Sequence, residues 1–229
     1  ILACLLTCLT CPSIQASDQS GQVLVQAVSG SVQYSLDDAT WKPLRADTSV
    51  PAGATIKTAA GSSADLMLRY NGSALRLTPN SRLRLEKLLT QSAGEETITD
   101  TRLKLLEGTL VGSQRKLHTP SQLAISTPNA TAVIRGTEYV VDASGAVSVI
   151  SGTVSVNYNL PGNGGDIKVP ILPGQSFDPA TGTVVPTTPE FLQNIIGHID
   201  TVHRNAEVFR TGGATIVVRN INNEPVSPS

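Results

Sequence analysis

Residues 74–88 read ALRLTPNSRLRLEKL, and this stretch decides the fold class. Leucines occupy alternate positions on both sides of a Pro-Asn-Ser turn, with basic side chains between them. Successive side chains of a β-strand point to opposite faces, so the pattern predicts strands that each bury one face. The apolar set is Leu75, Leu77, Leu83, Leu85 and Leu88, and the opposite set is Arg76, Arg82, Arg84 and Lys87. We expect the basic set to form a solvated face, with an anionic-ligand patch as the alternative.

The same alternation continues in both directions along the chain. Short alternating runs such as VLVQAV (23–28) and SVQYSL (31–36) are separated by Gly, Pro, Asn or Asp. A Gly followed by Ser or Thr and an aliphatic residue recurs in SGSV, EGTL and SGTV, at irregular spacing, which suggests similar corners rather than a fixed-period repeat. We predict an all-β domain over residues 22–185, either a short-stranded β-solenoid or roll or a two-layer β-sandwich-like domain.

The apolar period changes after residue 185. Apolar residues then recur in steps of three and four, which predicts one amphipathic helix over residues 189–211, with Thr188 as its N-cap. Gly212 or Gly213 is expected to end it, and a short strand over residues 215–220 precedes the tail of this C-terminal segment, 186–229. The stripe is a candidate helix interface, or it covers the open end of the β domain; its residues are Phe191, Ile195, Ile199, Val202, Ala206 and Phe209.

The first sixteen residues, ILACLLTCLTCPSIQA, carry no charge and resemble the end of a signal peptide. The apolar run is too short to span a membrane, and we expect cleavage near Ala16. Because the sequence starts with Ile and lacks a basic leading region, we expect its true start to be missing. All three cysteines lie here, so the mature chain has none; a lipoprotein acylated at Cys8 or Cys11 is the alternative. We predict a periplasmic or secreted protein without a membrane span in its mature chain.

Composition argues against several function classes. The chain has 17 Lys and Arg against 18 Asp and Glu, in no basic cluster, which argues against a nucleic-acid partner. The histidines His118, His198 and His203 fit no nucleophile or metal motif, and neither a phosphate-binding loop nor a mature cysteine is present. We therefore expect no catalytic residues, metal or cofactor. A polysaccharide-active β-helix enzyme is the remaining catalytic reading, and the 3% aromatic content disfavours it.

Three stretches together resemble the FecR domain family. They are residues 28–85, LKLLEGTLVGS at 103–113, and ISTPNATAVIRGTEYVV at 125–141, which is similar to the family pattern "TP…A…RGT-E-F-x-V". The most specific piece is Arg135-Gly136-Thr137-Glu138, and the resemblance covers residues 21–178. It implies a bacterial envelope module whose best-known relatives relay receptor occupancy to a sigma factor. The anti-sigma segment, membrane helix and receptor-contacting C-terminal domain of those relatives are not seen, so the chain resembles exported FecR-domain proteins.

Three residues are candidates for partner contact. Arg135 and Glu138 form either a structural network or a contact site, and Trp41 either packs in the core or presents a stacking surface for sugar or peptide. We expect a non-enzymatic protein- or glycan-binding module of the envelope with a role in signal relay, acting through a strand edge or the helix. The alternative is a structural cell-surface component that self-assembles.

Overall fold

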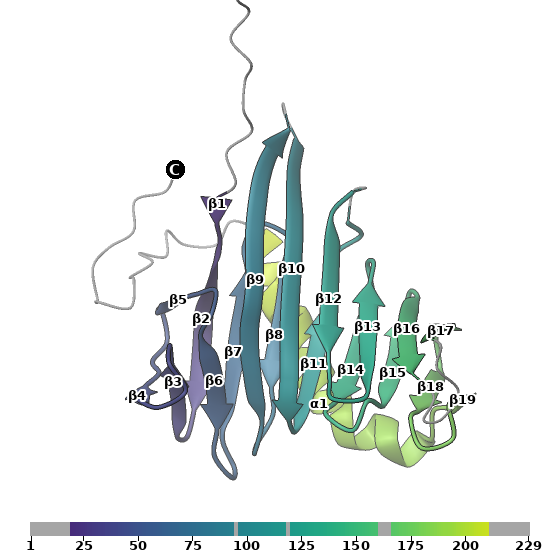
Figure 1. Cartoon of the computed structure of the whole chain (residues 1–229). Helices are drawn as coiled ribbons and strands as arrows, with labels where there is room; N and C mark the ends of the chain where they lie inside the picture. The colour runs from purple at the N-terminus through teal and green to yellow at the C-terminus, as the bar shows by residue number, and fades with distance from the viewer. Residues whose placement is uncertain (1–18, 94–95, 118–119, 160–165, 211–229) are drawn as a thin grey trace, which may run out of the picture.

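The computed structural model describes residues 19–93, 96–117, 120–159 and 166–210 (Figure 1). In these residues the strands form two large sheets. Sheet A runs in the order β17 (Asp166–Ile171), β16 (Val154–Asn159), β13 (Ala130–Ile134), β12 (Gln122–Ser126), β10 (Glu96–Glu107), β9 (Arg82–Ala93), β6 (Thr55–Thr58), β3 (Val32–Ser35) and β4 (Lys42–Pro43), with β1 (Gln19–Ser20) paired to β9. Sheet B runs in the order β19 (Thr183–Pro186), β18 (Gln175–Asp178), β15 (Val147–Ser151), β14 (Glu138–Asp142), β11 (Thr109–Ser113), β8 (Ser73–Leu77), β7 (Ser63–Leu68), β2 (Gln22–Ser29) and β5 (Ser49–Pro51).

The chain crosses repeatedly between the two sheets, so that both are built up in parallel along the sequence. Strands β7 and β8 pair in sheet B, β9 and β10 in sheet A, β14 and β15 in sheet B, and β16 and β17 in sheet A. The three recurrent Gly motifs lie at crossings, and Gly30, Gly108 and Gly152 all have φ between 73° and 77°. A positive φ suits glycine because it has no Cβ. The motif therefore marks the corners where the backbone changes sheet.

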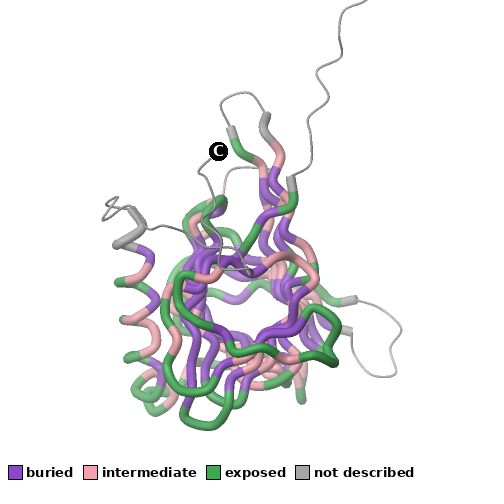
Figure 2. The backbone as a smooth tube through the Cα atoms, turned by 90° about the vertical axis from the view of Figure 1, so that its left-hand side faces the viewer, coloured by how far each residue is buried: buried purple, intermediate pink, exposed green. Residues whose placement is uncertain are grey.

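One hydrophobic core fills the space between the sheets (Figure 2). It contains Leu75 and Leu77 from β8 together with Leu83 and Leu85 from β9, as their alternation predicts. The stretch 74–88 is thus not a hairpin of one sheet, because it crosses from sheet B to sheet A. The all-β prediction with a C-terminal helix is confirmed, whereas the solenoid alternative is not.

The helix α1 (Pro189–Arg210) lies across the outer face of sheet B (Figure 2). The Phe191 N–H donates to the Thr188 hydroxyl oxygen over 3.3 Å, as expected for an N-cap. The helix stripe covers a sheet face and not an open end. No helix in the described part of the chain has the length and apolar character needed to cross a membrane. The expected signal peptide, the C-terminal glycine cap and the strand at 215–220 lie outside the described residues.

The strands that end each sheet share one feature. Each of the four contains a proline, and among the described strands no inner one does; these residues are Pro43, Pro51, Pro170 and Pro186. Proline lacks the N–H that a neighbouring strand would need, so it hinders pairing at an edge. The two ends of each strand order are therefore protected against addition of another strand, whereas the two-residue strand β1, which pairs with β9 outside that order, has no proline.

Candidate functional site

The outer face of sheet A carries a polar depression of about 380 Å³, which we call the Trp41 groove. Its lining comes from five elements or loops and comprises Asp38, Trp41, Lys57, Thr58, Asn80, Ser81, Arg82 and Glu107. Lys57, Arg82 and Glu107 are cross-strand neighbours on β6, β9 and β10. Their chain neighbours Ile56 and Leu83 are buried in the core, so the alternation turns these three charged side chains outward.

Trp41 is half-buried on this outer face and is not part of the core between the sheets. The Lys57 ammonium lies 3.8 Å from the centroid of the indole ring, and the Arg82 guanidinium carbon lies 5.9 Å from it. A cation over an aromatic face is attracted by the ring quadrupole. The two cations therefore hold the ring against the sheet, and one ring face is occupied by Lys57.

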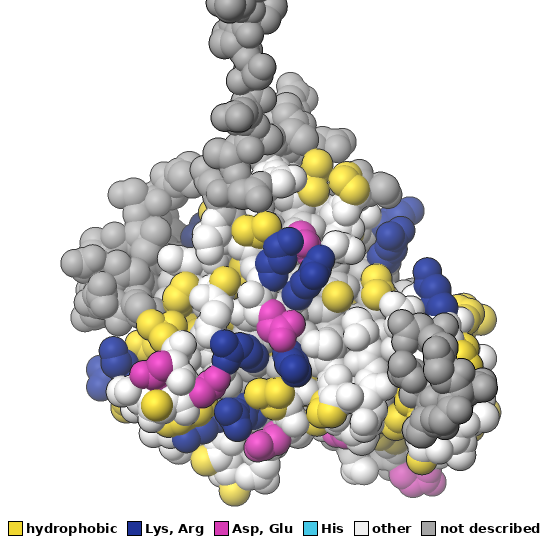
Figure 3. Space-filling model, in the orientation of Figure 1, with side chains coloured by type: hydrophobic (Ala, Val, Ile, Leu, Met, Phe, Trp, Pro, Cys, Tyr) yellow, Lys and Arg dark blue, Asp and Glu magenta, His cyan; other side chains and the backbone are white. Residues whose placement is uncertain are grey.

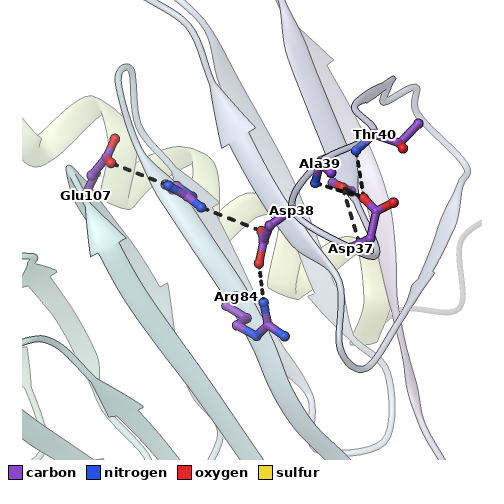
Figure 4. Close-up of polar contacts among 8 residues, drawn as sticks. Asp37, Asp38, Ala39, Thr40, Arg84 and Glu107 are labelled. Atoms are coloured by element: carbon purple, nitrogen blue, oxygen red, sulfur yellow. Dashed lines mark hydrogen bonds and ion pairs between the residues drawn. The ribbon is translucent and has the colours of Figure 1, made fainter.

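The loop that precedes Trp41 is fixed by the Asp37 carboxylate (Figure 4). Asp37 Oδ1 accepts the backbone N–H of Thr40 at 2.7 Å and of Ala39 at 2.9 Å, and the Ser35 hydroxyl donates to it at 2.8 Å. These hydrogen bonds, that of Thr40 first, hold the pKa of Asp37 well below its usual range. The carboxylate therefore stays charged and the turn that presents Trp41 stays closed at any physiological pH.

Ion pairs connect this loop to the sheet. Asp38 lies 2.5 Å from Arg84 and 3.6 Å from Arg82, and Arg82 also approaches Glu107 at 3.8 Å (Figure 4). Asp38 adopts a left-handed φ of 60°, which turns its side chain down to the sheet. The groove thus places an aromatic ring among charges of both signs.

A second set of ion pairs lies further along the same face, where Lys87 contacts Asp100 at 2.6 Å and Arg102 contacts it at 3.3 Å. Figure 3 shows basic and acidic side chains interspersed on this side of the molecule. The basic residues of β9 are therefore partnered by carboxylates, which supports a solvated, ion-paired face over an anionic-ligand patch.

Arg76 does not share that face, contrary to the expectation from the alternation. It belongs to β8 of sheet B, and its guanidinium donates to both oxygens of Asp65, at 2.8 and 3.0 Å, beneath α1. Burial raises the pKa of Asp65, and the Arg76 charge offsets this in part. Burial and then the Arg76 charge lower the pKa of His198 on the helix. Arg76 lies apart from the other basic residues because the chain crosses from sheet B to sheet A within residues 74–88, and the sequence pattern does not reveal that crossing.

Arg135 and Glu138 lie on either side of Gly136 and Thr137 but do not bond to each other in the described structure. Glu138 begins β14, receives the Ser151 hydroxyl at 3.4 Å, and lies 2.9 Å from His203 Nδ1 on α1. Glu138 thus connects the helix to sheet B, while Arg135 is exposed. Trp41 belongs to sheet A, so the three candidate residues do not form one site.

The helix stripe faces its own sheet. Ile195 and Val202 are buried, and Phe191 and Ile199 are partly buried, against an apolar patch on sheet B. That patch consists of Leu24, Met67, Ala74, Val111 and Val140. The side chain of Phe209 lies outside the described part. A partner would reach the stripe only if α1 left the sheet.

The histidine and carboxylate side chains of the described residues do not cluster. Within the described ranges, no three His, Cys, Asp or Glu side chains gather as a metal site would require. His198, Asp200 and His203 share one helix but do not converge on one point. His118 lies outside the described residues.

Comparison with known proteins identifies the β domain. Residues 54–155 match the family model described as FecR protein, so this part of the chain is a FecR domain. The match runs from the start of β6 into β16 and therefore includes strands of both sheets. It is shorter than the range of 21–178 over which the sequence resembles the family.

Two solved structures are similar, and both are described as proposed anti-sigma factors from Parabacteroides distasonis. One has 16% sequence identity and a TM-score of 0.45, with 62% of this chain and 63% of that chain covered. The other has 14% identity and a TM-score of 0.46, with coverage of 76% and 82%. The chain thus spans about 63% of the length of the first. No curated protein matches the sequence.

Proposed function

We propose that this chain is a non-enzymatic envelope protein related to signalling, whose FecR domain binds a partner protein at the Trp41 groove. The observation that carries the proposal is a tryptophan held on a rigid sheet among paired arginines and carboxylates. Tryptophan and arginine are the residue types most often responsible for binding energy at protein interfaces. Export to the periplasm or the cell exterior is part of the proposal, supported by the signal-peptide-like leader and by the usual envelope association of FecR proteins.

A protein partner fits the groove better than a glycan. A sugar that stacks on an indole needs an open ring face, and Lys57 covers one of the two faces at 3.8 Å, which leaves a sugar only the other. A protein surface can instead form ion pairs of its own with Arg82, Asp38 and Glu107, which lie at the rim in half-exposed ion pairs. Such charges favour specificity and fast association more than raw affinity, as a signal relay requires.

Self-assembly through sheet edges is the competing function, and the edge strands argue against it. The strands at the two ends of each sheet all carry a proline, which leaves those edges short of a hydrogen-bond donor, and the remaining edge strand, β1, has only two residues. A component that polymerised through its edges would need an uninterrupted row of donors and acceptors. The same prolines also disfavour capture of a partner strand at the ends of the sheets, which favours the sheet face as the binding surface.

The test is site-specific photocrosslinking in native envelopes. A photoreactive amino acid replaces Asn80, an exposed residue of the groove, in the complete gene product, and the control replaces Thr181 in the β18–β19 turn. We expect a discrete protein adduct at position 80 that is absent at position 181 and is lost when Trp41→Ala is added. No adduct at position 80, or an adduct that persists in the Trp41→Ala variant, would contradict binding at the groove.

A further inference from the structure

A second depression, of about 480 Å³, lies at the end of the sandwich where β7 turns into β8. We call it the cationic depression because Arg69, Arg115 and Lys116 line it. The remaining lining residues are Tyr70, Asn71, Gly72, Thr97, Thr99, Leu117 and Ser121. It shares no residue with the Trp41 groove.

The three cations have no acidic partner in the described part of the chain. Among the residues that the structure describes, no carboxylate lines the depression, and none of the three side chains forms an ion pair. This differs from the face of sheet A, where Arg82, Arg84 and Lys87 each have an acidic partner. Unpaired cations gathered in a concave surface attract anions and donate charge-assisted hydrogen bonds to them.

A buried hydrogen-bond network fixes the two segments that carry these cations. The Gln114 amide donates to the Asn71 carbonyl oxygen at 2.8 Å, and Gln114 also bonds to the Ser73 hydroxyl. The Asn71 side chain accepts the Ser73 N–H at 3.1 Å and donates to Thr101 at 3.1 Å. Gln114, Asn71 and Ser73 are all buried. The β7–β8 turn and the segment after β11 are therefore joined, although they lie far apart in the sequence.

Two glycines allow the segment that carries Arg115 and Lys116 to pack closely. Gly72 has a φ of 66°, as the Asn-Gly turn predicts, and a Cβ there would lie 2.7 Å from Arg115 Cδ. Gly136 of the Arg-Gly-Thr-Glu motif has a φ of 78°, and a Cβ there would lie 2.6 Å from Lys116 Cα. A larger residue at position 136 would push the backbone of this segment away, and one at position 72 would displace the Arg115 side chain. The most specific piece of the FecR pattern thus packs directly against the backbone of the cationic depression.

We propose that the cationic depression binds a phosphorylated sugar. Arg69, Arg115 and Lys116 suit a phosphate, and the hydroxyls of Thr97 and Ser121 suit sugar hydroxyls. Tyr70 is 52% exposed and offers a ring for the sugar. Thr99 also lines the site, and its buried hydroxyl has no hydrogen-bond partner among the described residues. The volume lies within the range of about 300–1,000 Å³ that is usual for small-ligand sites.

The test is a titration of the full exported chain with glucose-6-phosphate, in which amide chemical shifts report the site and calorimetry reports the affinity. Glucose and inorganic phosphate are titrated separately. We expect glucose-6-phosphate to bind more tightly than either, with shifts near Asn71 and Arg115. It should bind at least about tenfold more weakly to Arg115→Gln, which loses a charge-assisted hydrogen bond to the phosphate. The matched control Lys168→Gln, an exposed cation on β17, should leave affinity unchanged.

Three outcomes would overturn the proposal: no binding of glucose-6-phosphate, equal binding by inorganic phosphate, or equal affinity in the Arg115→Gln variant. A phosphorylated disaccharide distinguishes the source of the ligand, because tighter binding than the monosaccharide indicates an envelope glycan and weaker binding indicates a free sugar phosphate. The Trp41→Ala variant should retain the affinity, so failure at the Trp41 groove and failure here are separable.

Discussion

Replacement of Tyr139 by Phe is expected to stabilise the protein. Tyr139 lies in β14, an inner strand of sheet B, is fully buried, and its ring end packs over Gly112 of β11. Within the described residues its hydroxyl has no hydrogen-bond partner, and burial raises the pKa of the phenol. A buried hydroxyl without a partner costs about 1–3 kcal/mol in protein mutational data. Removing it leaves the ring in place and also restores the Phe of the family pattern.

We therefore expect the free energy of unfolding to rise by about 1 kcal/mol, the low end of that range, because the lost oxygen leaves a small void. For a chain of this length that corresponds to a melting temperature higher by roughly 2–4 °C. The assay is urea unfolding followed by circular dichroism, with calorimetry as a second measure.

Tyr158→Phe is the matched control. Its hydroxyl is also near the core but donates to the Pro179 carbonyl oxygen at 2.6 Å, so its loss should cost about 0.5–1.5 kcal/mol. The two Tyr-to-Phe changes thus have opposite expected signs. A neutral or destabilising Tyr139→Phe would refute the reasoning and indicate that the hydroxyl has a partner such as an internal water.

Three further predictions concern the helix and the edges. Ile195→Ala should lower the free energy of unfolding by about 2 kcal/mol in urea titrations, because this side chain of α1 is buried against sheet B; no loss would mean that the helix does not pack there. The pKa of His198 is lowered in the folded state, so its contribution to stability is present above the ordinary value of 6.5 and declines as the pH falls below it. Wild type should therefore lose more stability on acidification than His198→Gln, and equal pH profiles would count against this. Pro170→Val should give β17 a continuous row of donors and raise self-association in light scattering. A valine introduced at an exposed turn position, Thr181→Val, should not.

The fold follows from the sequence where the signal is local. Alternation predicts which leucines of β8 and β9 are buried, the three-and-four spacing predicts α1, and Thr188 predicts where it begins. The change of sheet within residues 74–88 was not predictable, because a β-strand buries one face whether its neighbour lies in the same sheet or in the opposite one. The wrong prediction for Arg76 follows from this, because the surroundings of its side chain depend on α1, which lies more than a hundred residues later in the chain.

The candidate sites depend mainly on contacts between distant residues. Trp41 is a visible candidate because it is the sole tryptophan. The position of its ring, however, depends on Lys57 and Arg82, which strand pairing brings next to it. Asp38 looks like an ordinary turn residue and yet pairs with Arg84, 46 positions away. The cationic depression has no sequence signal of its own. Its segments meet through Gln114 and Asn71, 43 positions apart, and only Gly136 belongs to a recognisable motif.

The central claim is that a monomeric two-sheet module binds a partner through the Trp41 groove and does not polymerise. Sedimentation velocity of the exported chain, alone and with the protein recovered by crosslinking at position 80, tests it most directly. The account predicts a monomer at every concentration, a defined complex when the partner is added, and no complex with the Trp41→Ala variant. Growth of the sedimentation coefficient with concentration in the absence of a partner would contradict it.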